Sequence, residues 1–352
     1  MKLLVLGGTS FVGRAIVNAA LSRGHAVTTF NRGRTGSDVP GVAVLRGDRD
    51  RDDGLNALQG RTFDAAIDTS GLVPAQTLRT VHALSRSVGF YAYVSSVSVY
   101  ADWERTRVDE ESRVLDADPY EDGDPGNPRR YAVRKAGSER AVALGYPADR
   151  SLILRPGTIV GPYDNVGHLL WWLQRIAQGG EVLAPGSPDR GLQLLDVRDM
   201  ADFLVARVEN WAPGVLNMVP CRANTTMGGL LRAMASVTGS DPEFVWASDQ
   251  ELLEAEVLPW LEMPFWLPDQ PRYRAAWAVS GDRAAASGLD PRPIEDTLGD
   301  TWQWLAAGGA VSRMPGSFPP GMTRLREQKL LQALRVWKEK PWDAPSGAHE
   351  SR

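Results

Sequence analysis

Short, nearly continuous apolar runs recur along the first half of this chain, and stretches with apolar residues at helical spacing lie between them. Runs of this kind are typical of strands that are buried on both faces of a parallel sheet. Their alternation with helices predicts an α/β fold with a doubly wound parallel sheet. We expect strands near residues 2–6, 26–30, 42–45, 64–68, 90–95 and 151–155.

A glycine-rich turn joins the first predicted strand to the first predicted helix. It reads Leu6-Gly7-Gly8-Thr9-Ser10-Phe11-Val12-Gly13, and a helical pattern from 11 to 23 ends at Gly24 before the second strand. A strand, glycine turn, helix and strand in this order place a pyrophosphate on the N–H groups of a helix N-terminus. Ser10 replaces the middle glycine of the usual pattern, so a tight turn without a ligand is the alternative.

The end of the second predicted strand bears on the choice of cofactor. An NAD site normally has Asp or Glu there to bind the ribose hydroxyls, and such a carboxylate would repel the 2′-phosphate of NADP. This chain has Asn31-Arg32-Gly33-Arg34 instead. Arg32 and Arg34 offer charge-assisted hydrogen bonds to a phosphate, which favours NADP(H). NAD(H) is the alternative if these arginines are solvated loop residues.

A tyrosine and a lysine one helical turn apart offer proton chemistry. Tyr131 stands at the head of a predicted helix that runs to about residue 144, and Lys135 shares its face. The charge of Lys135, with that of an oxidised nicotinamide, would lower the pKa of Tyr131 from about 10. Ser96, after the strand at 90–95, is placed to hold a substrate oxygen. The alternative is a surface Tyr and Lys on an amphipathic helix.

These motifs resemble a short-chain dehydrogenase/reductase of the extended type, in the NAD-dependent epimerase/dehydratase family, over roughly residues 1–300. Further matching runs are Asp68-Thr69-Ser70-Gly71, Arg155-Pro156-Gly157-Thr158-Ile159-Val160-Gly161-Pro162, Leu195-Asp196-Val197-Arg198-Asp199 and Gly214-Val215-Leu216-Asn217. The resemblance implies a Rossmann-type sheet and the catalytic residues Ser96, Tyr131 and Lys135, with Tyr131 as general acid/base. The predicted cofactor-binding residues are Gly7, Thr9, Ser10, Phe11, Val12, Asn31, Arg32, Arg34, Asp48, Ser70, Gly71, Lys135 and Pro156. Asp48 would lie near the adenine, unless it belongs to a solvated acidic loop.

Departures from the family pattern narrow the chemistry. Val97 and Ser98 stand where sugar-nucleotide dehydratases have an Asp-Glu pair, so the acid and base for removing water are missing. Thr158 replaces an Asn that binds diphosphate in the epimerases, and Leu192 aligns with an Arg, although Arg190 is near. We therefore take Ser98, Thr158 and Arg190 as candidate substrate contacts. The motifs are closer to a branch that includes bacterial reductases and chloroplast stem-loop-binding proteins.

The chain divides into a nucleotide part and a lobe for the substrate. We expect a dinucleotide-binding domain over 1–162 with returning segments at about 191–220, and a smaller, interleaved C-terminal substrate lobe over 163–190 and 221–310. Within the returning segments, 193–195 and 214–218 are expected to rejoin the main sheet. Residues 311–352 form an extension, whose amphipathic helix at 322–337 would cap the lobe or support a homodimer.

Aromatic residues gather in the predicted lobe, and they would line an apolar pocket or fill the core of the lobe. The loop over 258–268 is the preferred candidate for substrate contact, and the loop at 101–127 borders the active-site mouth or is simply solvated. The aromatic residues are Trp246, Trp260, Phe265, Trp266, Tyr273 and Trp277.

Composition excludes several classes of protein. The 352 residues carry a net charge of −4, which gives no electrostatic footprint for nucleic acid or an anionic membrane. No apolar run reaches the ~20 residues that span a bilayer. One Cys and four His residues offer no metal cluster and no internal disulfide. With the first strand at residue 2 leaving no room for a signal peptide, we expect a cytoplasmic protein whose partner is a small-molecule substrate.

Three functions fit these observations. The preferred one is an NADP(H)-dependent reductase or dehydrogenase that acts on a carbonyl or alcohol of a small metabolite. An epimerase that oxidises its sugar or sugar-nucleotide substrate and reduces it from the other face, with NAD(P) retained, is the alternative. A non-catalytic dinucleotide sensor or nucleic-acid-binding relative is disfavoured by the intact Ser96, Tyr131 and Lys135.

Overall fold

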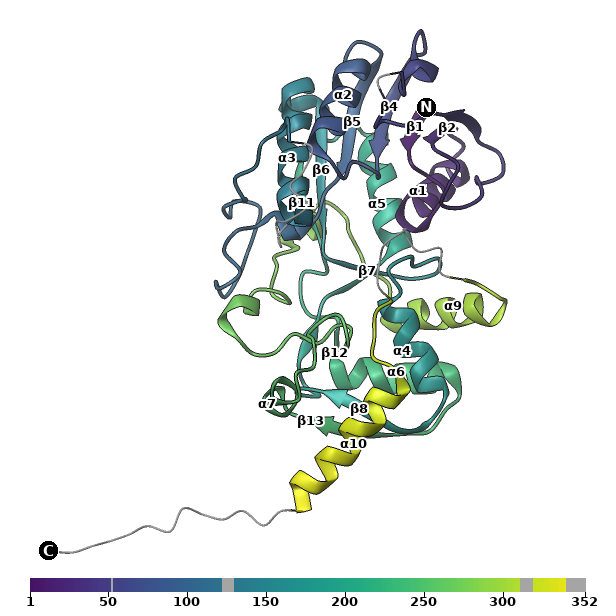
Figure 1. Cartoon of the computed structure of the whole chain (residues 1–352). Coiled ribbons are helices and arrows are strands. Elements are labelled where there is room, and N and C mark those ends of the chain that lie inside the picture. The colour runs from purple at the N-terminus through teal and green to yellow at the C-terminus, as the bar shows by residue number, and fades with distance from the viewer. Residues whose placement is uncertain (52, 122–129, 311–318, 340–352) are drawn as a thin grey trace, which may run out of the picture.

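The computed structural model describes residues 1–51, 53–121, 130–310 and 319–339 (Figure 1). Its main element is a seven-stranded sheet with the order β11-β6-β5-β4-β1-β2-β3, and all of its pairings are parallel. The order reverses between β1 and β4, which is the place where doubly wound folds bind ligands. The strands are β1 (Lys2–Leu6), β2 (Ala26–Asn31), β3 (Ala43–Arg46), β4 (Phe63–Asp68), β5 (Val88–Val94), β6 (Ser151–Pro156) and β11 (Gly214–Met218).

Helices cover both faces of this sheet (Figure 1). On one face lie α1 (Phe11–Ser22) and α5 (Val197–Glu209), and on the other α2 (Pro74–Leu84) and α3 (Arg130–Gly145). Successive side chains of β1 point to opposite faces, so Leu3 packs in the α1 and α5 core while Leu4 packs in the α2 and α3 core. Burial on both faces explains why the strands read as continuous apolar runs.

A second core lies in the lower part of Figure 1. It is built around the parallel pair of β8 and β13, with helices packed on it. The elements there are α4 (His168–Ala177), β8 (Gly180–Pro185), β9 (Gly191–Leu192), β12 (Thr225–Thr226), α6 (Met227–Thr238), β13 (Pro242–Ala247), α7 (Asp249–Glu254), α9 (Ile294–Ala306) and α10 (Arg324–Glu339). Between the two cores run β7 (Thr158–Val160) and β10 (Leu194–Asp196). The short helix α8 (Asp282–Ala286) packs on β11, with Ala284 buried in the α1 and α5 core.

The helix α10 caps the second core. Its apolar side chains Leu330, Leu331 and Leu334 are buried there. The buried Glu327 carboxylate accepts a hydrogen bond from Arg175 Nε at 2.6 Å and another from the backbone N–H of Leu183 at 3.1 Å. Capping of the lobe, one of the two roles expected of this helix, is therefore what the structure shows, and the homodimer stays a prediction.

The segment at 193–195 corrects one expectation. It does not return to the main sheet, because β10 pairs only with β7 in a separate two-stranded sheet. The chain leaves the main sheet at Gly157, where a Cβ atom would lie 2.6 Å from the Val219 side chain. The other predicted strands agree with the structure to within a few residues, whereas the predicted domain boundaries stay predictions. Residues 311–318 and 340–352 of the predicted extension lie outside the described residues.

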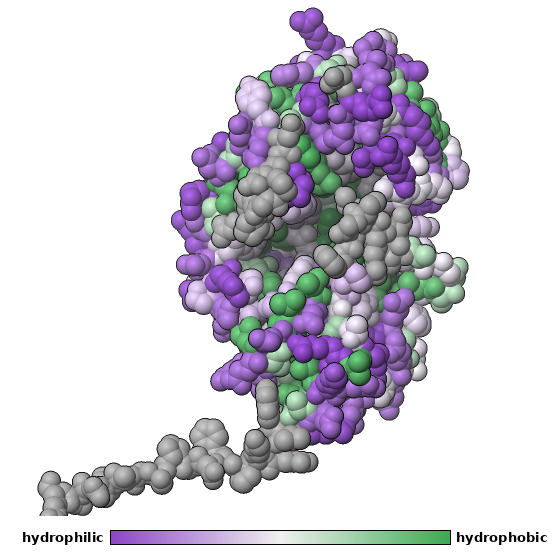
Figure 2. All heavy atoms as spheres, viewed as in Figure 1, coloured by the Kyte–Doolittle hydropathy of each residue, from purple (hydrophilic) through white to green (hydrophobic). Residues whose placement is uncertain are grey.

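The molecule is hollowed between its upper and lower parts, with hydrophobic side chains visible at depth (Figure 2). No helix within the described ranges combines the length and apolar character needed to cross a membrane.

Candidate active site

Two cavities meet where the sheet faces the second core. The first, of about 510 Å³, runs along the glycine-rich turn and is lined by Gly7, Ser10 and Pro156 among others; we call it the glycine-turn groove. The second, of about 430 Å³, is lined by Trp103, Trp260, Tyr273 and Trp277 among others; we call it the aromatic cavity. Five residues line both: Ser96, Tyr131, Gly157, Thr158 and Trp260.

The glycine-rich turn leaves a helix N-terminus open to an anion. Gly7 has a φ of 111°, and a Cβ atom on Gly13 would lie 2.6 Å from the backbone N of Gly8, so both positions require glycine. The side chain of Ser10, the N-cap of α1, makes no capping hydrogen bond, and the first turn holds no acidic residue. The unpaired N–H groups of this turn therefore fit a pyrophosphate.

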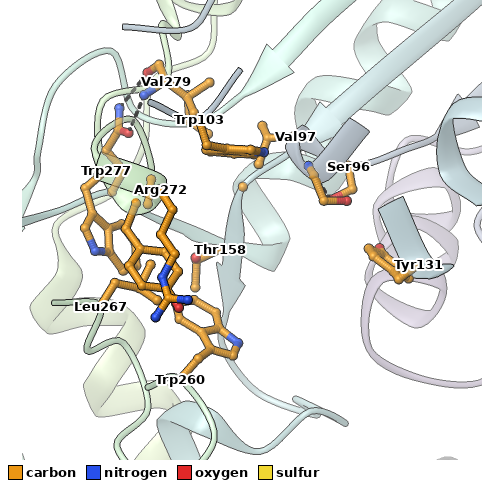
Figure 3. Close-up of a pocket in the computed structure, with 16 residues that line it drawn as sticks. Ser96, Val97, Trp103, Tyr131, Thr158, Trp260, Leu267, Arg272, Trp277 and Val279 are labelled. Carbon is orange, nitrogen blue, oxygen red and sulfur yellow. Dashed lines mark hydrogen bonds between the residues drawn. The ribbon is translucent and has the colours of Figure 1, made fainter. Parts of the chain in front are cut away.

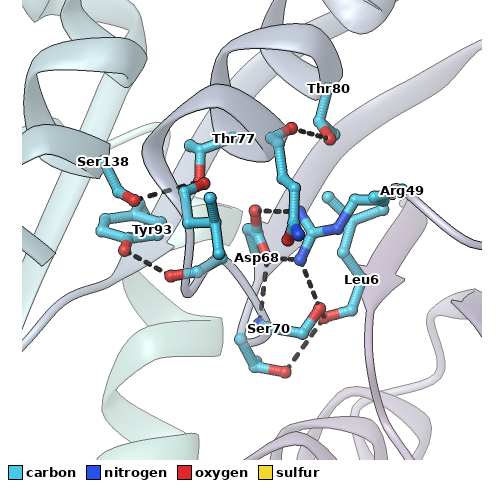
Figure 4. Close-up of polar contacts among 12 residues, drawn as sticks. Leu6, Arg49, Asp68, Ser70, Thr77, Thr80, Tyr93 and Ser138 are labelled. Atoms are coloured by element: carbon cyan, nitrogen blue, oxygen red, sulfur yellow. Dashed lines mark hydrogen bonds and ion pairs between the residues drawn. The ribbon is translucent and has the colours of Figure 1, made fainter. Parts of the chain in front are cut away.

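The end of β4 is held by a buried polar network (Figure 4). Arg49 Nη1 donates to Asp68 Oδ2 at 2.7 Å, and Arg49 Nη2 donates to Ser70 Oγ at 2.6 Å. Ser70 Oγ in turn donates to the carbonyl of Leu6 at 3.1 Å. Burial alone would raise the pKa of Asp68, but Arg49 outweighs it and lowers that pKa. This network fixes Ser70 in the wall of the glycine-turn groove.

The end of β2 carries the residues predicted to select the cofactor. Arg32 lines the glycine-turn groove, with its Nη1 at 3.9 Å from Asp48 Oδ1. Arg34 Nη2 lies 3.8 Å from Asp48 Oδ2, and the side chains of Arg32 and Arg34 are 45% and 70% exposed. Both separations exceed hydrogen-bond length, so a phosphate with a shorter approach can compete for these guanidinium groups.

The predicted cofactor residue Asn31 instead shapes the turn after β2. Its Oδ1 accepts hydrogen bonds from the N–H of Gly33 at 2.8 Å and from Arg46 Nη1 at 2.7 Å, while its Nδ2 donates to Asp38 at 3.0 Å. Asn31 does not line the groove, and neither does Asp48. The other predicted cofactor residues line it, except Arg34 and Gly71.

Ser96 and Tyr131 stand at the junction of the two cavities. Ser96 follows β5, and its Oγ accepts a hydrogen bond from the N–H of Ser98 at 3.2 Å, which caps the short helix Val97–Val99. Tyr131 comes from the first turn of α3 and is 54% exposed. Partial removal from water raises the pKa of Tyr131, and a hydrogen bond with Ser96 opposes this rise.

Lys135 is held by protein groups other than Tyr131. Its Nζ donates to the carbonyls of Val94 at 2.7 Å and Gly71 at 3.1 Å, and to the hydroxyl of Tyr93 at 3.2 Å. These contacts tie Lys135 to the end of β5 and to the loop after β4, and burial raises the pKa of Tyr131 in this structure. The lowering expected with an oxidised nicotinamide beside Tyr131 stays a prediction. Burial lowers the pKa of Lys135 to about 8.

The three predicted substrate residues have different surroundings. Thr158 lines both cavities, and Ser98 lines the aromatic cavity with its Oγ buried and without a hydrogen-bond partner among the described residues. Arg190 lines neither of them. Its Nη2 donates to Asp249 at 2.7 Å and its Nη1 to the carbonyl of Leu267. The guanidinium is therefore occupied by the lobe itself.

Some aromatic residues of the lobe fill its core, and others line the aromatic cavity, as Trp260 and Trp277 do in Figure 3. Trp266 is fully buried in the second core. Trp260 and Trp277 line the aromatic cavity, with ring centroids 5.9 Å apart. Trp260 has a φ of 66°, a left-handed conformation that is rare for a side chain of this size. Such strain is typical of positions that the surrounding structure holds for a function.

Several lining residues were not predicted. Trp103 lines the aromatic cavity and comes from the loop at 101–127, which is expected from the sequence to border the mouth of the active site. Arg272 also lines this cavity, and no sequence motif marks it. Asp164 and His168 line the glycine-turn groove. Burial raises the pKa of Asp164 to about 6 and lowers that of His168 to about 4, so His168 is neutral at pH 7.

The arrangement brings an anion-binding turn, a hydroxyl pair and an apolar cavity to one place. Within the described ranges, no group of three His, Cys, Asp or Glu side chains is arranged to hold a metal ion. The residues of the groove fit a dinucleotide, because the glycine turn accepts a pyrophosphate and the groove ends at Ser96 and Tyr131.

Comparison with known proteins agrees with this arrangement. The model of the NAD dependent epimerase/dehydratase family matches residues 3–218. Chloroplast stem-loop binding protein of 41 kDa b from Arabidopsis thaliana is 27% identical over 267 residues, which cover 71% of this chain and 67% of that protein. A 2-alkyl-3-oxoalkanoate reductase from Stenotrophomonas maltophilia is 28% identical over 232 residues, which cover 61% and 67% respectively.

Solved structures share the fold. WbmH from Bordetella bronchiseptica in complex with NAD+ has a TM-score of 0.66 at 17% identity, over 88% of this chain and 99% of that one. Human epimerase family protein SDR39U1 with NADPH has a TM-score of 0.59 at 21% identity, over 86% and 99%. Because the family model spans more than half of its residues, the chain belongs to the NAD-dependent epimerase/dehydratase family, as an extended short-chain dehydrogenase/reductase with a site for a nicotinamide dinucleotide.

Proposed function

We propose that this chain is an NADP(H)-dependent oxidoreductase that transfers hydride to or from a carbonyl or alcohol carbon of a small molecule. The observation that carries the proposal is the shared wall of the two cavities, where Ser96 and Tyr131 face both the glycine-turn groove and the aromatic cavity. A cofactor in the groove and a substrate in the cavity would therefore meet at these two hydroxyl groups.

The chemistry divides between the cofactor and the side chains. When bound, the dinucleotide supplies or accepts the hydride. In the reductive direction, the O–H of Tyr131 donates the proton that the substrate oxygen gains, and the O–H of Ser96 holds this oxygen by a hydrogen bond. The glycine turn would bind the pyrophosphate, and Lys135, which lines the groove, would contact the ribose by exchanging one of its hydrogen bonds within the protein. In the oxidative direction, Tyr131 takes the proton back.

The preference for NADP(H) rests on Arg32 and Arg34. They flank Asp48 beyond hydrogen-bond length, and β2 ends in Asn31 without a carboxylate to repel a 2′-phosphate. Two similar proteins favour this proposal: one structure contains NADPH, and one relative is named as a reductase.

Calorimetric titration of NADPH and NADH into freshly purified protein tests the proposal. An aliquot is first denatured to ask whether a cofactor was retained. We expect empty or exchangeable protein with tighter binding of NADPH. Tightly retained NAD would overturn the NADP preference and favour an epimerase with resident cofactor, the activity named for solved structures of the same fold.

The variant Tyr131→Phe separates binding from chemistry. It removes the hydroxyl that transfers the proton and keeps the ring, so we expect unchanged NADPH affinity and loss of turnover in a screen of carbonyl compounds. Turnover equal to that of the parent would contradict the role of Tyr131.

A further inference from the structure

The walls of the aromatic cavity are largely apolar. Rings of Trp103, Trp260, Tyr273 and Trp277 line it, together with aliphatic side chains such as Leu267 (Figure 3). Flat rings are best packed against other flat or apolar groups. Sugar hydroxyls would leave many hydrogen bonds unmade against these walls.

Polar atoms in the cavity wall are few, and two of them have no partner. Trp277 Nε1 and Ser98 Oγ are buried and make no hydrogen bond with any described residue. Gln193, by contrast, is fully occupied, because its Nε2 donates to the carbonyls of Pro220 and Val279 and its Oε1 accepts from the N–H of Val279. Both atoms are shielded from the cavity as well as from bulk water, so neither offers a hydrogen bond to a ligand there.

Arg272 gives the cavity its charge. It is the only residue with a formal charge among the described residues that line the cavity. Its Cζ lies 4.8 Å from the centroid of the Tyr273 ring, which holds the planar guanidinium against an aromatic face. Arg272 forms no ion pair within the described parts of the chain, unlike Arg190, whose guanidinium is bound to Asp249. A stacked arginine without a carboxylate partner is suited to bind one from a ligand.

We infer that the aromatic cavity binds a flat, ring-bearing carbonyl compound or alcohol that carries a carboxylate. The ring packs among Trp103, Trp260 and Trp277, and the carboxylate binds Arg272. This inference rests on the proposed function, which places the reacting carbon at Ser96 and Tyr131, and it adds the class of the substrate.

Binding of three probes to the full chain with NADP+ present tests the inference without requiring turnover. The probes are 2-naphthoate, its uncharged counterpart 2-acetylnaphthalene, and UDP-glucose, and binding is followed by calorimetry. We expect 2-naphthoate to bind roughly fivefold or more tightly than 2-acetylnaphthalene, because only the acid can pair with Arg272. UDP-glucose should bind most weakly. Tighter binding of UDP-glucose than of either naphthalene would overturn the inference.

Three variants locate the bound probe. Arg272→Gln should abolish the advantage of 2-naphthoate over 2-acetylnaphthalene. The matched control is Arg274→Gln, which removes the same charge from an exposed arginine that does not line the cavity, and it should leave the advantage unchanged. Trp277→Leu removes a ring from the cavity wall, so it should weaken the binding of both naphthalene probes by about threefold to tenfold. An unchanged advantage in Arg272→Gln would refute the carboxylate site.

Failure of this inference can be told apart from failure of the proposed function. The same titrations are run in Tyr131→Phe, which cannot transfer the proton but keeps the cavity. If the acid binds there and the parent reduces no carbonyl compound, the proposed function fails and the ligand class stands. If the parent reduces carbonyl compounds but neither naphthalene binds, only the ligand class fails.

Discussion

Arg49 and Asp68 form a bidentate ion pair that is closed off from bulk water. Arg49 Nη1 lies 2.7 Å from Asp68 Oδ2 and Nη2 lies 3.2 Å from Oδ1, while the two residues are 8% and 0% exposed. The pair joins the loop after β3 to the end of β4, beside the glycine-turn groove (Figure 4).

Breaking this pair should cost much stability. In Asp68→Asn the guanidinium of Arg49 stays buried without a counter-charge, so the free energy of unfolding should fall by about 3–5 kcal/mol in urea denaturation. Asp53→Asn is the control, because Asp53 pairs with Arg51 at an exposed site and should change stability by about 1 kcal/mol or less. Equal effects of both substitutions would contradict this account.

The same ion pair should make the stability of the protein depend on pH in the acid range. The pKa of Asp68 in the folded protein lies below its ordinary value of 3.8. Its contribution to stability is therefore complete above this value and is lost as the pH falls through the lowered pKa. The free energies of unfolding of the parent and of Asp68→Asn should therefore converge as the pH is lowered from neutral into this acid range.

Burial of Lys135 should make the stability of the protein depend on pH in the alkaline range. Burial lowers its pKa from 10.5 to about 8, so between these values the folded protein has lost a proton that the unfolded chain keeps. The free energy of unfolding should rise with pH across this window, by up to about 3 kcal/mol relative to Lys135→Met. Urea titrations of cofactor-free protein at a series of pH values measure this difference. The variant Lys329→Met changes an exposed lysine and keeps Lys135, so its free energy of unfolding should rise with pH as in the parent.

Arg32 should distinguish the two dinucleotides. Arg32→Ala removes a guanidinium from the groove wall, so the dissociation constant of NADPH should increase by about tenfold or more, since a charge-assisted bond to phosphate is lost. The dissociation constant of NADH should stay the same within twofold. Arg51→Ala removes the same charge from an exposed side chain outside the groove and should affect neither cofactor. Equal losses for NADPH and NADH would show that Arg32 acts on the fold of the loop.

Gly13 should tolerate no side chain. A Cβ atom there would lie 2.6 Å from the N of Gly8, so Gly13→Ala should displace the turn, weaken cofactor binding and lower stability by about 1–3 kcal/mol. Gly299→Ala in α9 is the matched control, because a Cβ there meets no atom within 4 Å. That substitution should raise the melting temperature, since alanine favours the helix by about 1 kcal/mol. A loss at Gly299 as large as that at Gly13 would contradict the steric explanation.

The sequence was sufficient for the main sheet because most of its strands, the exposed edge strand β3 apart, are buried on both faces. A run such as 3–6 is buried and apolar at every position, which makes it visible without knowledge of its neighbours. The strands β8 and β13 form a separate two-stranded sheet, and they were not predicted from the sequence. Ser96 and Tyr131 could be found because each is fixed by its own strand end or helix start.

The partners of Lys135 and the role of individual tryptophans could not be predicted. Lys135 binds the carbonyls of Gly71 and Val94, and every residue offers a carbonyl, so no letter of the sequence marks these acceptors. Trp266 and Trp277 lie in irregular segments without the periodicity that separates a buried face from an exposed one. Only their packing shows that the first fills the core and the second lines the cavity.

Trp260 gives the molecule a property beyond the positioning of ligands. One ring, held on a left-handed backbone, lies in the wall of both cavities and contacts His168 on one side and Trp277 on the other. A ligand that displaced this ring from one cavity would also change the shape of the other. Thermodynamic linkage would then require the two affinities to change by the same factor, so that a single side chain would couple occupancy of the groove to occupancy of the cavity.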